Sequence, residues 1–137
     1  MSLRFGILME EKEALQMNAL QLAYIGDSVW ELIVRHELII QKFNVHHMHR
    51  RCIGLVNARS QSRILLAIHD RLTENEKEIV RRGRNAHPKH AAPRNQNPDD
   101  YAASTGFEAL FGFLYLTGQD QRISDLMNVI REVEQNV

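Results

Sequence analysis

Apolar residues recur three or four positions apart along most of the chain, which is the spacing of helices that bury one face. After a short helix or extended entry near residues 10–14, the pattern predicts longer helices over about residues 16–40 (beginning at 16 or 18), 57–70, 73–83, 97–117 and 120–134. The helix that ends near Ile40 is apolar on more than one face, so we expect it at the centre. No stretch alternates apolar and polar residues for long, so the sequence predicts an all-α fold.

Several helix ends are marked by local signals. Thr73 followed by Glu76 forms a capping box at the start of one helix, and Gly83 is expected to end it. Asn97 before a proline is typical of a helix start, and Gly118 is typical of a helix end. These signals fix the boundaries of the helices on both sides of the segment 84–96.

Two adjacent residues of the central helix are unusual for a helix interior. Glycine at position 26 costs roughly 1 kcal/mol relative to alanine, and the Asp27 carboxylate is costly beside packed neighbours unless something binds it. Positions four apart share a helix face, so Ala23, Asp27 and Glu31 line up, and the small Ala23 leaves space above Asp27. Gly26 would add further room. The space suits a hard cation that also contacts phosphate; an aspartate satisfied by hydrogen bonds in a close helix contact is the open alternative.

Glu108 is the second unexplained carboxylate, because it stands alone in an otherwise apolar stretch, GFEALFGFLYL. If its helix packs against the helix of Asp27, the two acids meet, and one would protonate unless a divalent cation neutralises both. Mg²⁺ is commonly held by one or two carboxylates together with water and substrate phosphates. Because a metal ion can activate water, no nucleophilic side chain is required. Phosphodiester hydrolysis is therefore the leading chemistry.

The chain carries no net charge, but its positive charges are unevenly placed. The segment 81–98 contains five basic residues and no acidic one, and it is predicted to be a long loop: Arg81, Arg82, Arg84, Lys89 and Arg94. A local field of this kind attracts phosphates even when the whole molecule is neutral. A solvated loop with incidental charge is the alternative.

A second basic segment, VHHMHRRCIGLV, begins at Val45. We interpret it as a solvated turn in which His49, Arg50 and Arg51 could contact phosphate. Its three histidines followed by Cys52 do not match the spacing of a closed tetrahedral zinc site, so zinc is disfavoured.

Length and composition indicate one globular domain over residues 1–137. The single cysteine cannot form an internal disulfide, so the chain makes no demand for an oxidising compartment, and we expect a cytoplasmic protein. The longest apolar run, 109–116, is too short to span a membrane, and no export signal is recognisable at the start.

Two blocks of sequence resemble the ribonuclease III family. LAYIGDSVWELIV resembles the family signature around its aspartate, and GFEALFGFLYL resembles the second block around its glutamate. With the intervening RRGRN segment, the chain most resembles the Mini-III ribonucleases, the short class without a double-stranded RNA-binding domain. The similarity covers roughly Leu20 to Leu116.

The resemblance assigns Asp27 and Glu108 as catalytic, metal-binding residues. The two other acids of the longer enzymes fall on Ala23 and Thr105, so the number of bound metals is open. Glu31, Ser104 and Thr105 are further candidates for holding water or orienting ligands. The expected phosphate contacts are the two basic segments, specifically Arg81, Arg82, Arg84, Asn85, Lys89, His49, Arg50 and Arg51.

The resemblance further implies a homodimer that cuts double-stranded RNA to leave 5′-phosphate and 3′-hydroxyl ends. It implies Mg²⁺ as the cofactor, with Mn²⁺ as a candidate substitute, and 23S ribosomal RNA precursor as the substrate in a bacterial cytoplasm. A small helical core with Trp30, Phe107, Phe111 and Phe113 would leave apolar surface to spare for a dimer. Two alternatives stay open: an inactive ribonuclease III-like RNA-binding domain, and a helical interaction module that does not bind RNA.

Overall fold

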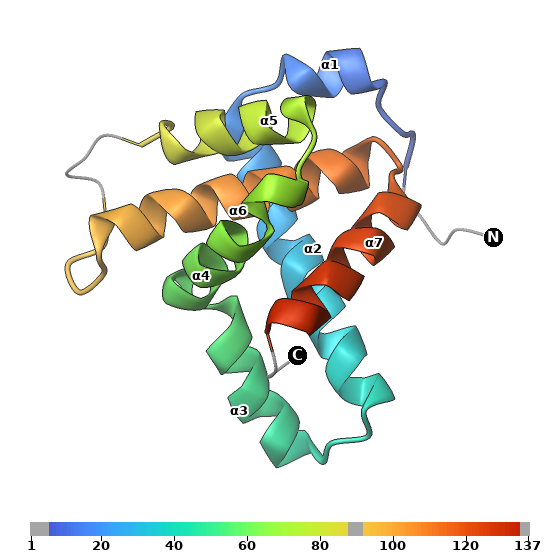
Figure 1. The fold of residues 1–137 in the computed structure, drawn as a ribbon, viewed down its shortest axis with the longest axis vertical. Helices are drawn as coiled ribbons and strands as arrows, with labels where there is room; N and C mark the ends of the chain where they lie inside the picture. Colours follow the sequence, from blue (N-terminus) through green and yellow to red (C-terminus); the bar gives the residue numbers. More distant parts are fainter. Residues whose placement is uncertain (1–5, 88–91, 135–137) are drawn as a thin grey trace.

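The computed structural model describes residues 6–87 and 92–134, and within these ranges helices are the only regular secondary structure. Seven α-helices and one short 3-10 helix follow one another (Figure 1): α1 (Glu11–Leu15), α2 (Ala19–Ile40), α3 (Val45–Val56), α4 (Ala58–Ile68), η1 (His69–Arg71), α5 (Glu74–Arg84), α6 (Pro98–Leu116) and α7 (Asp120–Val133). None of the helices in these ranges combines the length and the apolar character needed to cross a lipid bilayer. The prediction of an all-α fold is confirmed.

Helix α2, expected at the centre, packs against α6, and α6 is the more deeply buried of the two. Every residue from 103 to 114 except Glu108 is buried. Figure 1 shows α6 crossing α2 near the middle of the molecule, with α5 beside it, and α4 and α7 also contact it. One apolar face of α2 is instead exposed, as Leu32 at 68% and Ile39 at 62% exposure show. The apolar pattern of α2 alone therefore could not show which of its faces has a partner within the chain.

Glycine brings α2 and α6 into backbone contact. A Cβ at position 26 would overlap the carbonyl oxygen of Glu108, and one at position 112 would overlap the carbonyl oxygen of Leu22. The prediction that Gly26 opens room beside Asp27 is therefore wrong, because the α6 backbone fills that space. Its role is the close helix approach, and this approach fixes Asp27 next to the turn of α6 that carries Glu108.

A second pair of glycines joins α5 to α6. Gly83 lies within α5, and a Cβ on it would come within 2.6 Å of the Cα atom of Gly106. The prediction that Gly83 ends its helix is wrong, because the residue is required for this contact and α5 continues to Arg84. The other helix-end signals are confirmed: Thr73 forms the capping box, and Gly118 adopts a positive φ of 70° after α6.

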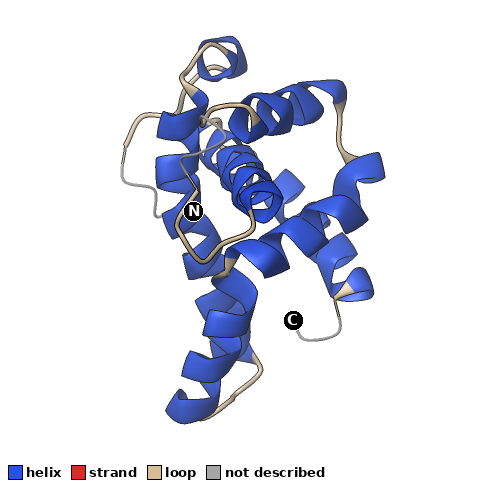
Figure 2. Cartoon of the chain, turned by 90° about the vertical axis from the view of Figure 1, so that its left-hand side faces the viewer, coloured by secondary structure: helices blue, strands red, loops and turns tan. Residues whose placement is uncertain are grey.

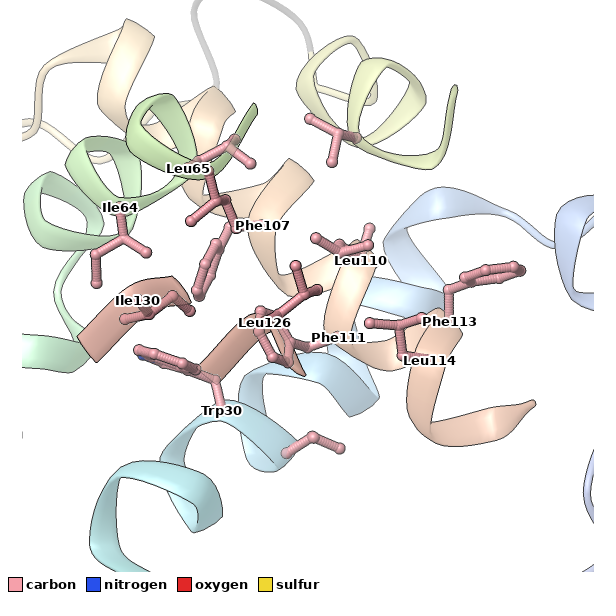
Figure 3. Close-up of a cluster of buried hydrophobic side chains, with 14 of the residues drawn as sticks. Trp30, Ile64, Leu65, Phe107, Leu110, Phe111, Phe113, Leu114, Leu126 and Ile130 are labelled. Carbon is pink, nitrogen blue, oxygen red and sulfur yellow. The ribbon is translucent and has the colours of Figure 1, made fainter. Parts of the chain in front are cut away.

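Aromatic rings from α2 and α6 form the centre of the core (Figure 3). The Trp30 ring meets Phe107 edge to face at a centroid distance of 4.8 Å and lies 5.3 Å from Phe111. The indole Nε1 of Trp30 donates a hydrogen bond to the carbonyl oxygen of Leu55 at 3.0 Å. Trp30, Phe107, Phe111 and Phe113 are all at most 1% exposed. The prediction that these four aromatics belong to a helical core is confirmed.

The segment predicted as a basic turn is the helix α3. The Asn44 side chain caps it by accepting a hydrogen bond from the backbone N–H of His47 at 2.9 Å. Cys52 and Leu55 are buried on its inner side, at the helical spacing of three residues. Together with the end of α2, α3 forms an arm that extends from the body in both views (Figures 1 and 2). The apolar stripe of α3 is short and lies among charged residues, so the sequence pattern did not predict a helix here.

Candidate active site

Asp27 and Glu108 meet in the structure although they are far apart in the sequence. Asp27 lies on α2 and Glu108 on α6, and the close approach at Gly26 holds these turns together. A side-chain hydrogen bond joins the two carboxyl groups, and both line the same surface hollow. Asp27 is exposed and Glu108 is partly buried, so the acids are less enclosed than the sequence suggested.

The pKa of Glu108 lies well above its ordinary value. Burial is the largest effect on Glu108, and the hydrogen bond and negative charge of Asp27 add to it, so the pKa of Glu108 rises to about 8. A hydrogen bond from Gln61 opposes the rise but does not cancel it. In the metal-free protein Glu108 is therefore mostly protonated at pH 7 and can donate to the Asp27 carboxylate. This is the behaviour of two acids placed together without a cation between them.

The hollow over the acid pair has a volume of about 380 Å³. Since one water molecule takes up about 30 Å³ of liquid water, it has room for a hydrated cation and a phosphate group. Its lining combines small, polar and ring-bearing side chains with the two acids: Leu20, Ala23, Tyr24, Ile25, Ser28, His87, Tyr101, Ser104 and Thr105. We call this space the acidic hollow.

Of the three supporting candidates, two reach the acidic hollow and one does not. Ser104 Oγ and Thr105 Oγ1 both line it and donate to the backbone carbonyl of Tyr101, at 2.9 Å and 3.1 Å. Each hydroxyl proton is used inside α6, so each oxygen is left as an acceptor for water. Glu31 lies one turn beyond Asp27 and accepts a hydrogen bond from Arg35 at 3.1 Å. It is outside the hollow.

A second hollow, about 710 Å³ in volume, adjoins the first and contains the basic side chain of Arg84. Asn85 also lines it, and His87 and Tyr101 line both hollows, so they stand at the boundary between them. The acid Asp99 also lines this second hollow. We call this space the basic hollow, after Arg84. Lys89, predicted as a phosphate contact, lies outside the described residues.

Arg81 and Arg82 do not lie on the loop where the sequence placed them, because α5 runs to Arg84. Arg81 forms an ion pair with Glu78 at 2.6 Å. Arg82 is 3.9 Å from the same carboxylate and donates to the Met17 carbonyl oxygen at 3.4 Å. The charge count of the segment 81–98 left out Glu78, one helical turn before it, which offsets part of the positive field.

The basic residues of α3 lie on the arm and line neither hollow. His49 borders an apolar groove between α2 and α3, whose lining also includes Ile39 and Val45. The Arg51 guanidinium stacks over the Phe43 ring, 4.7 Å from its centroid. Arg50 is exposed. These three side chains are therefore separate from the acid pair.

Three residues that sequence reasoning passed over contribute to the site. The His87 and Tyr101 rings stack at a centroid distance of 4.9 Å between the two hollows. Tyr101 lies one helical turn before Thr105 and two before Glu108. This spacing places it on their face of the helix and could have identified it from the sequence. Gln61 is 1% exposed and contacts Glu108 from α4. In the sequence, Gln61 could have been identified as a polar residue in the apolar stripe of its helix.

Among the described residues, no group of three or more His, Cys, Asp or Glu side chains is arranged to hold a metal ion. The acidic hollow thus offers two carboxylates, and any further ligands to a cation would be water or substrate.

Residues 20–119 match the ribonuclease III domain family. The chain belongs to the ribonuclease III family. As a member it is an endoribonuclease, which sets aside the alternative of a helical interaction module.

The similarity to relatives extends over most of the chain. The chain is 46% identical to mini-ribonuclease 3 of Symbiobacterium thermophilum over 114 residues, and this match covers 82% of the chain and 87% of the relative. It is 40% identical over 114 residues to mini-ribonuclease 3 of Synechocystis, covering 83% of this chain and 78% of the relative. The crystal structure of protein FN1578 from Fusobacterium nucleatum superposes with a TM-score of 0.76 at 29% identity, covering 87% of this chain and 95% of that one.

Proposed function

We propose that this ribonuclease III-family enzyme hydrolyses double-stranded RNA with the help of Mg²⁺, and that Asp27 and Glu108 hold the cation. The observation that carries the proposal is a hydrogen-bonded pair of acids in an open hollow that adjoins a basic one. The pair fits a divalent cation, because Asp27 and Glu108 bring two carboxyl groups to the same open hollow and carboxylate oxygens are the ligands that Mg²⁺ prefers. Mn²⁺, with similar ligand preferences, is expected to substitute.

The side chains of the acidic hollow have separate tasks in this mechanism. A bound Mg²⁺ would neutralise the acids, polarise a phosphate oxygen and activate water. Asp27, the more exposed acid, and Glu108 would hold the ion, and Glu108 would do so in its deprotonated form. The Ser104 and Thr105 oxygens accept hydrogen bonds from water in the hollow. Ala23 leaves space where a larger side chain would exclude the phosphate.

The basic hollow is the proposed contact for the RNA backbone. Arg84 and Asn85 line it, and it shares His87 and Tyr101 with the acidic hollow, so a sugar-phosphate chain can pass from one to the other. Duplex RNA is recognised largely through its shape and backbone. Single-strand binders instead need rows of exposed aromatic rings. Lys89 belongs to the proposed contacts from its sequence position alone.

Cleavage of a duplex RNA in Mg²⁺ and in EDTA tests the proposal. We expect products with 5′-phosphate and 3′-hydroxyl ends in Mg²⁺ and in Mn²⁺, and no products in EDTA. An inactive RNA-binding domain, suggested by the neutral residues Ala23 and Thr105, is the alternative that membership of an endoribonuclease family disfavours. Binding without cleavage under both conditions would favour it.

Replacing Arg84 with alanine is expected to weaken duplex RNA binding and to lower the salt dependence of binding by about one unit of slope, since one phosphate contact is lost. Arg81→Ala is the matched comparison, because Arg81 lies on the same helix but is paired with Glu78. Its slope should change little. Binding is measured by fluorescence anisotropy over a range of KCl concentrations. Equal slopes for the Arg84 variant and the unmodified protein would contradict a phosphate contact in the basic hollow.

We further propose that the enzyme works as a homodimer, in the cytoplasm, on 23S ribosomal RNA precursor. Exposed aliphatic side chains on α2 and α3 support the dimer, two of them in the groove between these helices: Leu32, Ile39, Ile40, Val45 and Ile53. Patches of this kind on a monomer mark an interaction surface. The substrate rests on the resemblance to Mini-III ribonucleases. Sedimentation equilibrium tests the dimer, and cleavage of a precursor transcript near the mature ends tests the substrate.

A further inference from the structure

Gln61 is a polar residue in an apolar position. It lies on α4 in register with Ile64, Leu65 and Ile68, which form the buried stripe of that helix. Its side chain is 1% exposed. A buried amide is costly unless it finds a hydrogen-bond partner. Apolar packing alone therefore does not explain why glutamine occupies this position.

The partner of Gln61 is Glu108. The Gln61 Nε2 group donates to Glu108 Oε2 at 3.5 Å, which links α4 to α6. Gln61 is not part of the lining of the acidic hollow, so the contact reaches Glu108 from the protein interior. Glu108 is thus held between a neutral donor behind it and Asp27 at the surface.

We propose that Gln61 is a positioning residue for Glu108, acting on the orientation of this carboxylate toward the cation. The inference rests on the proposed function, because it gives the contact its purpose. A glutamate side chain has three rotatable bonds, and a hydrogen bond to one carboxylate oxygen limits its rotation and leaves the other oxygen available. The chemistry of the donor also matters. A lysine or arginine here would compete with the cation for Glu108, whereas a neutral amide orients the carboxylate without neutralising it.

Gln61→Met tests the role, because methionine has a similar length and flexibility but carries no donor. Partners of metal ligands typically contribute ten- to a hundredfold to metal affinity, and the 3.5 Å contact is long, so we expect Mg²⁺ affinity to fall about tenfold. Isothermal titration with MgCl₂ measures this in the absence of RNA. The Mg²⁺ concentration for half-maximal cleavage should rise equally, with kcat at saturating Mg²⁺ nearly unchanged.

Ser60→Ala is the matched control. Ser60 is the neighbouring residue, is also buried at 5% exposure, and donates to the Gly54 carbonyl rather than to Glu108. Its replacement should lower the unfolding temperature and leave Mg²⁺ affinity unchanged. Gln61→Asn is a second variant: it keeps the amide but is one methylene too short, so the same loss of Mg²⁺ affinity is expected.

The outcomes separate the two proposals. Normal Mg²⁺ affinity in both Gln61 variants, whatever their stability, would overturn the positioning role and leave the proposed function intact. If the unmodified protein neither binds Mg²⁺ nor needs it for cleavage, both proposals are refuted. A loss of affinity in the Gln61 variants but not in Ser60→Ala supports the role.

Discussion

Asp27→Asn is expected to lower the rate of duplex RNA cleavage by about a thousandfold or more. The variant keeps the size of the side chain but removes the charge that receives the cation, and charge stabilisation by a metal ion is worth several kcal/mol in the transition state. Asp27 is exposed, so the fold should tolerate the change. The rate is measured under single-turnover conditions at saturating enzyme, with RNA affinity determined in parallel.

Asp70→Asn is the control for this experiment. Asp70 is a fully exposed acid on η1 and lines neither hollow. We expect it to cleave at the normal rate, while Asp27→Asn retains RNA binding and does not cleave. Normal cleavage by Asp27→Asn would remove this residue from the catalytic machinery.

Glu108→Gln is expected to abolish cleavage to a similar extent and, at the same time, to stabilise the metal-free protein at alkaline pH. In the folded protein the pKa of Glu108 is about 8, against an ordinary value of 4.5. Because folding raises this pKa, its contribution to stability is fully present below about pH 4.5 and is lost as the pH rises through 8. Glutamine stays neutral and can still donate to Asp27, so the variant avoids this loss.

The size of the effect follows from the shift in pKa. One pKa unit corresponds to about 1.36 kcal/mol, and since Glu108 is partly exposed we expect the unmodified protein to lose only about 2 to 3 kcal/mol between pH 5 and pH 8.5. Urea unfolding in EDTA at several pH values measures the loss. Glu108→Gln should show a smaller dependence and exceed the unmodified protein in stability at pH 8.5.

Mg²⁺ supplies the control, because a cation between the acids would remove the repulsion. Adding it at pH 8.5 should restore the stability of the unmodified protein and leave Glu108→Gln almost unaffected. The same pH dependence in the two proteins would mean that Glu108 and Asp27 do not interact as described.

Much of the fold could be predicted because its signals are local. The Asn97 side chain caps the start of α6 and Thr73 that of α5, where the sequence indicated, and Asn18, one of the two starts considered, caps α2. The recurrence of apolar residues every three or four positions predicted the helices between these ends. Each of these features depends on residues within one or two turns, and such residues are visible in the sequence.

The errors came from contacts between distant residues. Gly83 was interpreted as a helix-ending glycine, but its role is the close contact with Gly106. The sequence alone does not show that these two glycines are neighbours. Trp30 was expected in the core, but the sequence did not show that its ring meets Phe107 and Phe111. Which apolar face is covered depends on the packing of several helices together.

The site was predictable in its acids and less so in their surroundings. Asp27 and Glu108 stood out because carboxylates in apolar helices require an explanation. Gln61 drew no such attention, since a neutral amide is a common residue in helices. Arg81 and Arg84 differ by less than one helical turn, yet one is paired with Glu78 and the other lines the basic hollow. Side-chain partners of this kind are set by the fold.

The most direct test of the shared cation is a crystal structure of the protein soaked in Mn²⁺, with anomalous scattering used to locate the metal. We predict an anomalous peak in the acidic hollow, about 2 Å from a carboxylate oxygen of Asp27 and from one of Glu108. The peak should be absent in Asp27→Asn crystals. Contradiction would come from a fully active protein whose only Mn²⁺ peak lies elsewhere, or from a peak that survives in Asp27→Asn.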